Sequence, residues 1–154
     1  MDPVVVAQNV LNQAWDKKLP VCIVSIAKEL GISILYDKSL EPVDGQLVYE
    51  DNQPQILINP DRSVENKRYT ACLMLAHHTL GHGQTMRDPF QVNPAYSVDP
   101  KVQDANLFVA EIIIPRQAVH FYANVKTKGL KELSDIFAVS QTAMRIRLER
   151  LGVV

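Results

Sequence analysis

The chain has 154 residues, of which 47% are hydrophobic and 21% are charged, as is ordinary for one globular domain. Its formal net charge of −1 creates no overall field that would attract nucleic acid or an anionic membrane. No apolar run approaches the ~18 residues that span a bilayer, and the opening MDPVVVAQNV lacks the features of a signal peptide. Cys22 and Cys72 are too few for a disulfide framework, so we expect reduced core thiols in a cytoplasmic protein.

Hydrophobic spacing predicts a helix-rich chain. Asp2 and Asp99 are suited to cap helices that begin at the prolines following them, and Gly31 is suited to end another helix. The predicted helices cover residues 3–17, 20–31, 63–82, 100–114 and 115–126, and two short helices follow within 130–152.

Strand patterns are confined to the first half of the chain. Residues 33–37 resemble a short strand, and residues 46–50 and 55–59 alternate around the turn DNQP, which predicts a β-hairpin. The proline-rich segment 83–100 is expected to be a loop. This order predicts an α+β fold with a small antiparallel sheet, in a single domain over 1–154 whose residues 115–154 form a packed helical subdomain.

The segment LAHHTLGHG, residues 75–83, holds histidines at a spacing used for metal binding. On a helix, His78 and His82 lie one turn apart and can aim both imidazoles at one point, as in the zinc motif HExxH. His77 has Gly81 at the corresponding position and therefore cannot pair with either histidine in this way. A helical histidine pair is also typical of hydrogen-bonded or surface residues without a metal.

Three longer segments resemble the ImmA/IrrE family of metallopeptidases. RYTACLMLAHHTLGHG is similar to that family's RFT…AHELGH segment, and DPKVQDANLFVAEIIIP is similar to DPxExxANxFAxELLMP. LSDIFAVSQTAMRIRLERLG resembles the closing stretch, and the hairpin GQLVYEDNQPQILIN also has a counterpart. The resemblance runs from about residue 20 to 152 and implies a helix-rich, zincin-like α+β fold.

The resemblance assigns zinc binding to His78 and His82, but it also reveals two departures from the pattern. Thr79 stands where the family has its catalytic Glu, and Val102 stands where it has the third metal ligand. A threonine hydroxyl does not act as a base near neutral pH, and valine has no lone pair to donate. The two histidines therefore imply zinc that is weakly held or absent.

Replacement ligands are scarce near Val102. Asp99 lies one helical turn earlier and is a weak candidate, because its carboxylate is expected to cap the helix. Asp104 and Glu111 point away from Val102 at about 100° per residue.

The segment 132–152 has the rhythm of a helix-turn-helix, with Ser140 as the N-cap of its second helix. Arg145, Arg147 and Arg150 on that helix are candidate DNA-binding residues. The alternative is a packed helical pair, in which the arginines form a solvated stripe and Ala143, Ile146 and Leu151 supply the core contacts.

Three functions follow as hypotheses. The first is a pseudo-peptidase that binds a protein partner and regulates by sequestration, since members of the resembled family act on helix-turn-helix repressors. Such a protein would serve as an antirepressor of a phage or mobile element, or as half of a toxin–antitoxin-like pair. The second is an active zinc endopeptidase that cleaves a repressor. The third is a DNA-binding regulator that uses the C-terminal helices.

Overall fold

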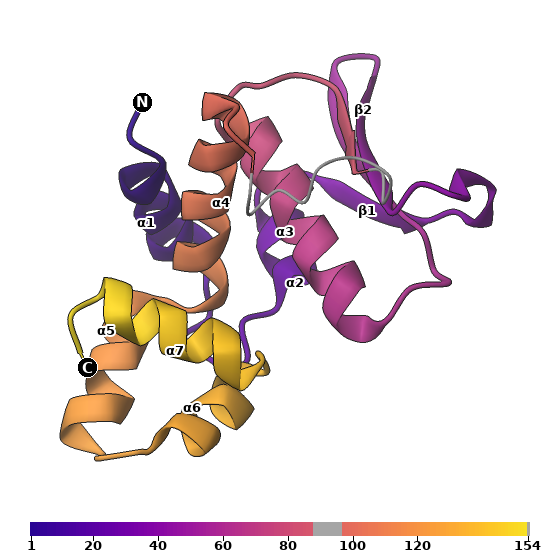
Figure 1. Cartoon of the computed structure of the whole chain (residues 1–154). Coiled ribbons are helices and arrows are strands. Elements are labelled where there is room, and N and C mark those ends of the chain that lie inside the picture. The colour runs from indigo at the N-terminus through magenta and orange to yellow at the C-terminus, as the bar shows by residue number, and fades with distance from the viewer. Residues whose placement is uncertain (88–96, 154) are drawn as a thin grey trace.

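The computed structural model describes residues 1–87 and 97–153, and it has a helical body with one small sheet (Figure 1). No helix within the described residues is both long and apolar enough to cross a bilayer. The elements in chain order are α1 (Pro3–Ala14), α2 (Ile23–Glu29), β1 (Ser33–Tyr36), the 3₁₀ turn η1 (Lys38–Leu40), β2 (Gly45–Glu50), β3 (Gln53–Ile58), α3 (Val64–Thr79), β4 (Thr85–Arg87), α4 (Pro100–Ile113), α5 (Arg116–His120), the π-helical turn η3 (Phe121–Val125), α6 (Leu130–Phe137) and α7 (Gln141–Arg150).

The sheet has the strand order β1-β3-β2-β4 and is mixed, so the prediction of a purely antiparallel sheet was wrong. β2 pairs antiparallel with both β3 and β4, but β1 pairs parallel with β3. After β1, the chain passes through η1 and forms β2, which is not adjacent to β1 in the sheet. β3 then lies between β1 and β2 and pairs with both. β4 lies in the segment that was expected to be loop, and residues 88–96 of that segment lie outside the described residues.

The predicted hairpin is confirmed, with a tighter turn than expected. Only Asp51 and Asn52 connect β2 to β3, and both have positive φ angles, of 50° and 65°. Positive φ at both central residues is typical of a type I′ turn, whose twist matches that of the flanking strands. The expected turn residue Pro54 therefore lies inside β3, opposite Tyr49.

Helix α3 is the centre of the molecule. It packs against β2 and β3, against α4 and against α2, and Figure 1 shows it between the sheet and α4. Every residue from 70 to 77 is buried, because neighbours cover the helix on all sides. A single core extends from Leu11 of α1 to Leu148 of α7, so the C-terminal helices share it.

One side chain that was expected in the interior is exposed. Cys22 is the N-cap of α2 and faces solvent, whereas Cys72 is fully buried as predicted. His120 is also exposed, at the end of α5. Cys22 precedes the first turn of a short helix, so its place at the helix end and not its residue type decides its exposure.

Gly45 of β2 lies against Thr70 of α3, and no side chain fits between them. A Cβ at this position would lie 2.5 Å from Thr70 Cγ2 and 2.9 Å from the carbonyl oxygen of Leu57. We expect Gly45→Ala to lower the free energy of unfolding by about 1–3 kcal/mol, as overpacking does. Urea unfolding measures this, with Gly129→Ala as control, because a Cβ there meets no atom within 4 Å. Equal effects of the two substitutions would contradict the steric explanation.

Candidate functional site

The histidine segment lies at the C-terminal end of α3, where the helix stops earlier than the sequence predicted. The helix ends at Thr79 with Leu80 as its C-cap, and Gly81 has a φ angle of +74°. Such a left-handed residue terminates helices and is readily adopted by glycine. His82 therefore lies beyond the helix, and the prediction that His78 and His82 share one helical face was wrong.

His78 faces the sheet and the N-terminal helices. Its Nδ1 atom lies 2.8 Å from the hydroxyl oxygen of Tyr49 on β2, at hydrogen-bond distance. It lines a cavity of about 390 Å³ together with Thr79 and with residues of α1 such as Asn9 and Gln13. Burial lowers the pKa of the His78 imidazole, which favours the neutral ring.

His82 pairs instead with His77, a contact between residues five apart that the helical i, i+4 spacing did not predict. The two Nδ1 atoms are 2.8 Å apart, so one ring donates a proton and the other accepts it. Burial and the charge of His82 lower the pKa of His77 to about 4. Burial lowers the pKa of His82, Lys101 lowers it further, and the carboxylates of Asp104 and Asp99 oppose the change. These neighbours place the histidine pair beside the start of α4.

The residues at the positions of the expected base and third ligand offer neither a base nor a metal ligand. The Thr79 hydroxyl donates to the carbonyl oxygen of Leu75 at 2.7 Å, one turn earlier on α3. Asp99 caps α4 as predicted, since its carboxylate accepts from the backbone N–H of Lys101 at 2.9 Å. Val102, one turn into α4, is partly buried and offers no donor atom.

A comparison with known protein families decides the identity of the domain. Residues 27–149 match the model of a peptidase family described as the IrrE N-terminal-like domain, and this span is well over half of the 154 residues. The chain belongs to the ImmA/IrrE family. No curated protein matches the sequence. The match confirms the resemblance seen in the motifs, together with the metallopeptidase-like α+β fold.

Among the residues that the structure describes, the donor atoms of this ImmA/IrrE domain do not form the three-ligand set with one open position that a catalytic zinc ion needs. Within residues 1–87 and 97–153, no three His, Cys, Asp or Glu side chains are grouped so that they could hold a metal. Because α3 ends at Thr79, a histidine pair within this helix would need its second member one turn before His77 or His78. Those positions hold Leu73 and Met74, and both are buried. The sequence motif therefore does not form a helical metal-binding pair.

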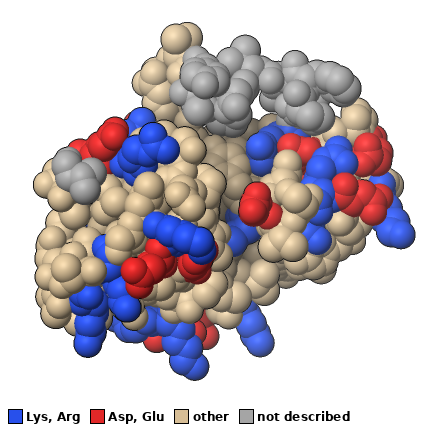
Figure 2. Space-filling view, turned by 60° about the horizontal axis from the view of Figure 1, so that its bottom comes forward, with Lys and Arg blue, Asp and Glu red and all other residues tan. Residues whose placement is uncertain are grey.

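The arginines of α7 differ from the predicted solvated stripe. Arg145 and Arg150 are exposed, but Arg147 is buried, and its Nε donates to the carbonyl oxygen of Ile114 at 3.0 Å. Met144 and Leu148 supply the core contacts of α7, while Ile146 is 43% exposed. The helix is rotated relative to the predicted face because Arg147 is drawn inward by a buried carboxylate. Basic and acidic side chains are interspersed on the face shown in Figure 2, without one continuous basic patch.

That carboxylate is Glu111 of α4, whose structural role the sequence analysis missed. Its side chain is fully buried and accepts hydrogen bonds from Arg116 Nε and Nη2 at 2.9 and 2.6 Å. Gln8 of α1 donates to the second oxygen at 2.7 Å, and Arg147 Nη2 lies 3.0 Å from the first. Burial raises the pKa of Glu111, but these arginines outweigh it and hold the pKa below its usual value. The sequence signal for this role was the glutamate at the start of the apolar run EIIIP, because a charge in such a run is buried only with a partner.

Proposed function

We propose that this ImmA/IrrE domain is a pseudo-peptidase that binds a protein partner and regulates it by sequestration. One observation carries the proposal: His78 and His82, which stand at the motif's two zinc-ligand positions, have different hydrogen-bond partners, Tyr49 for His78 and His77 for His82. The hydroxyl at the base position is also engaged by a backbone carbonyl. Loss of a positioned base costs ~10²–10⁴ in rate, and loss of the metal site removes the activated water as well.

Helix α3, which carries the histidine segment, is held to α4 and to the C-terminal helices by side-chain hydrogen bonds, and this supports a binding role. Tyr69 of α3 donates to the side-chain oxygen of Asn106 in α4 at 2.8 Å, and Arg68 anchors α3 to the C-terminal helices through the carbonyl oxygens of Phe137 and Ala138. Because the family resemblance implies repressor substrates, the proposed partner is a helix-turn-helix repressor or an antitoxin of a phage or mobile element. A cytoplasmic location, where such repressors act, is part of the proposal.

Co-expression with helix-turn-helix proteins encoded beside it in its own genome tests the proposal. We expect a stoichiometric complex in gel filtration, and we expect the partner in it to keep its full length. The chelator EDTA should not dissociate this complex. Cleavage of the partner that EDTA prevents would establish the peptidase instead. Failure of every neighbouring helix-turn-helix protein to form a complex would contradict the proposed partner class.

Restoring the two missing carboxylates provides a second test. We expect the double variant Thr79→Glu/Val102→Glu to remain inactive and to bind zinc sub-stoichiometrically, because His82 lies beyond the end of α3. Metal analysis of protein purified without chelator and a casein cleavage assay are the measurements. The wild type and the same double variant carrying His78→Ala are the controls. Stoichiometric zinc that disappears with His78→Ala would favour the alternative of an active zinc endopeptidase.

A further inference from the structure

A second cavity lies at the other end of α3, away from the histidines. It occupies about 450 Å³ between α3, α4 and the turn that joins α6 to α7. Its walls are mainly apolar and include Val109 and Ile113 of α4, Val139 of the turn and Ile146 of α7. This volume lies within the range of small-molecule sites, roughly 300–1,000 Å³, and apolar walls with few polar groups are typical of them.

Arg147 is one of the polar residues that line this cavity, and its guanidinium is buried. Its side chain is only 9% exposed, and its Nη2 atom lies 3.0 Å from Glu111 Oε1 without the geometry of a hydrogen bond. The same carboxylate already accepts two hydrogen bonds from Arg116. Two guanidinium groups therefore share one buried carboxylate, so the cluster of Glu111, Arg116 and Arg147 carries a formal charge of +1.

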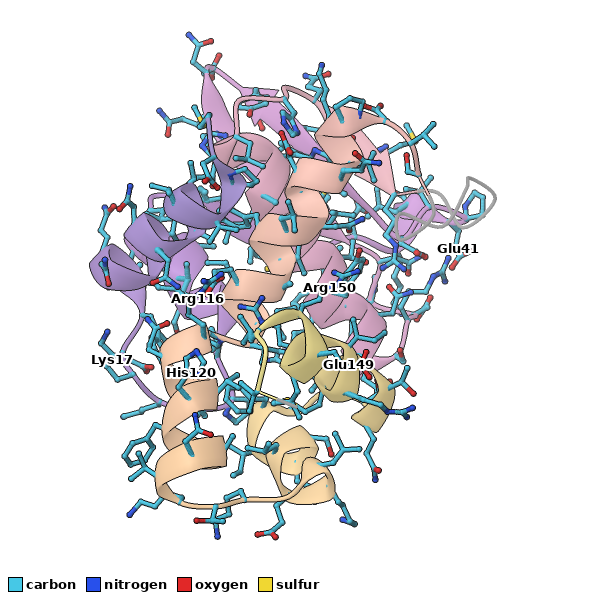
Figure 3. The ribbon with its side chains drawn as sticks, turned by 60° about the vertical axis from the view of Figure 1, so that its left-hand side comes forward. Lys17, Glu41, Arg116, His120, Glu149 and Arg150 are labelled. Carbon is cyan, nitrogen blue, oxygen red and sulfur yellow. The ribbon has the colours of Figure 1, made fainter. Side chains whose placement is uncertain are left out.

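The rim adds to this positive charge. The lining contains three cationic side chains, Arg68, Arg147 and Arg150, and one acid, Glu65, so its formal charge is +2. The donors of Arg68 bind the backbone carbonyl oxygens of Val21, Phe137 and Ala138. Arg150 is exposed near the end of α7, and Figure 3 shows it away from Arg116, which lies at the start of α5.

We propose that this cavity binds a small amphipathic carboxylate, whose aliphatic body fills the apolar space between α4 and α7 and whose charged group pairs with Arg147 and Arg150. The apolar walls account for binding of the aliphatic body, and the net positive charge of the lining accounts for the preference for an anion. A buried donor that lacks a well-oriented partner gains most from such a ligand. The proposal is independent of the protein partner proposed above.

Three ligands with the same eight-carbon chain and different head groups test the proposal on the full-length protein. Octanoate, octanol and octylamine are titrated while the methyl resonances of Val109, Ile113 and Ile146 are followed by NMR. We expect saturable shifts with octanoate, weaker binding of octanol and the weakest binding of octylamine. Equal affinity for all three, or octanoate shifts that avoid these methyl groups, would overturn the proposal.

Exposed variants supply tests that leave the core untouched. Arg150→Gln is expected to weaken octanoate binding by a factor of about 2 to 5, and Glu65→Gln to strengthen it by a similar factor, as for partly exposed charge pairs. Arg145→Gln is the matched control, because Arg145 is an exposed arginine of the same helix that does not line the cavity. The proposal fails if Arg145→Gln weakens binding as much as Arg150→Gln does, or if Glu65→Gln weakens it.

Discussion

Replacing Glu111 by alanine is expected to lower the free energy of unfolding by about 3–5 kcal/mol. The carboxylate is fully buried and binds Arg116 and Gln8 directly, with Arg147 beside it. Removal of the carboxylate leaves the buried guanidinium of Arg147 without a counter-charge. It also removes the hydrogen bonds that link α4 to Gln8 of α1 and to Arg116 of α5. The cost comes mainly from the stranded charge, because a buried ion pair as a whole contributes little.

Urea unfolding followed by circular dichroism measures this effect. Glu111→Gln should lower stability by less than alanine, because the amide retains an oxygen that can accept from Arg116. Lys131→Met is the control, since it removes an ion pair with Asp135 that is exposed on both sides, and we expect an unchanged midpoint. A Glu111→Ala midpoint equal to that of Lys131→Met would show that the buried cluster does not stabilise the fold.

Acidification is expected to destabilise the protein through His77. Its pKa falls from 6.5 to about 4 on folding, because burial and the neighbouring His82 disfavour a second charge. Since the unfolded chain takes up the proton first, the stability linked to His77 is fully present above pH 6.5. It is lost as the pH falls toward 4. The shift corresponds to a loss of about 2 kcal/mol between pH 7.5 and 5.0.

The slope of stability against pH isolates this contribution. We expect the free energy of unfolding of the His77→Asn variant to change less between pH 7.5 and 5.0 than that of the wild type, whatever its absolute stability. Lys131→Met again serves as control and should keep the wild-type slope. Parallel curves for wild type and His77→Asn would contradict the lowered pKa and the paired geometry with His82.

Local signals in the sequence predicted the elements well. Asp2, Asp99 and Ser140 cap their helices as expected, through hydrogen bonds to backbone N–H groups two or three residues later. The hairpin was also predictable, because alternation and turn residues act over a few positions. By contrast, the parallel pairing of β1 with β3 depends on how the chain returns through space, which no local pattern of Ser33–Tyr36 encodes.

The candidate site shows the same division between local and tertiary information. Residues 78–82 match the family motif except at Thr79, but whether the two histidines meet depends on where the helix ends. Gly81 signalled that end, yet the HxxxH spacing was interpreted as helical throughout. Arg147 was misplaced for a related reason, because its inward position depends on Glu111, which lies 36 residues away in sequence.

The burial of Leu73 and Met74 also constrains how a metal site within α3 could arise by mutation. A new histidine at either position would place an imidazole in a close-packed interior before any metal was present to stabilise it. A carboxylate and a third ligand would be needed as well, and none of these changes is useful alone. Under the proposed function, a gain of catalysis would therefore require several substitutions that are each harmful on their own.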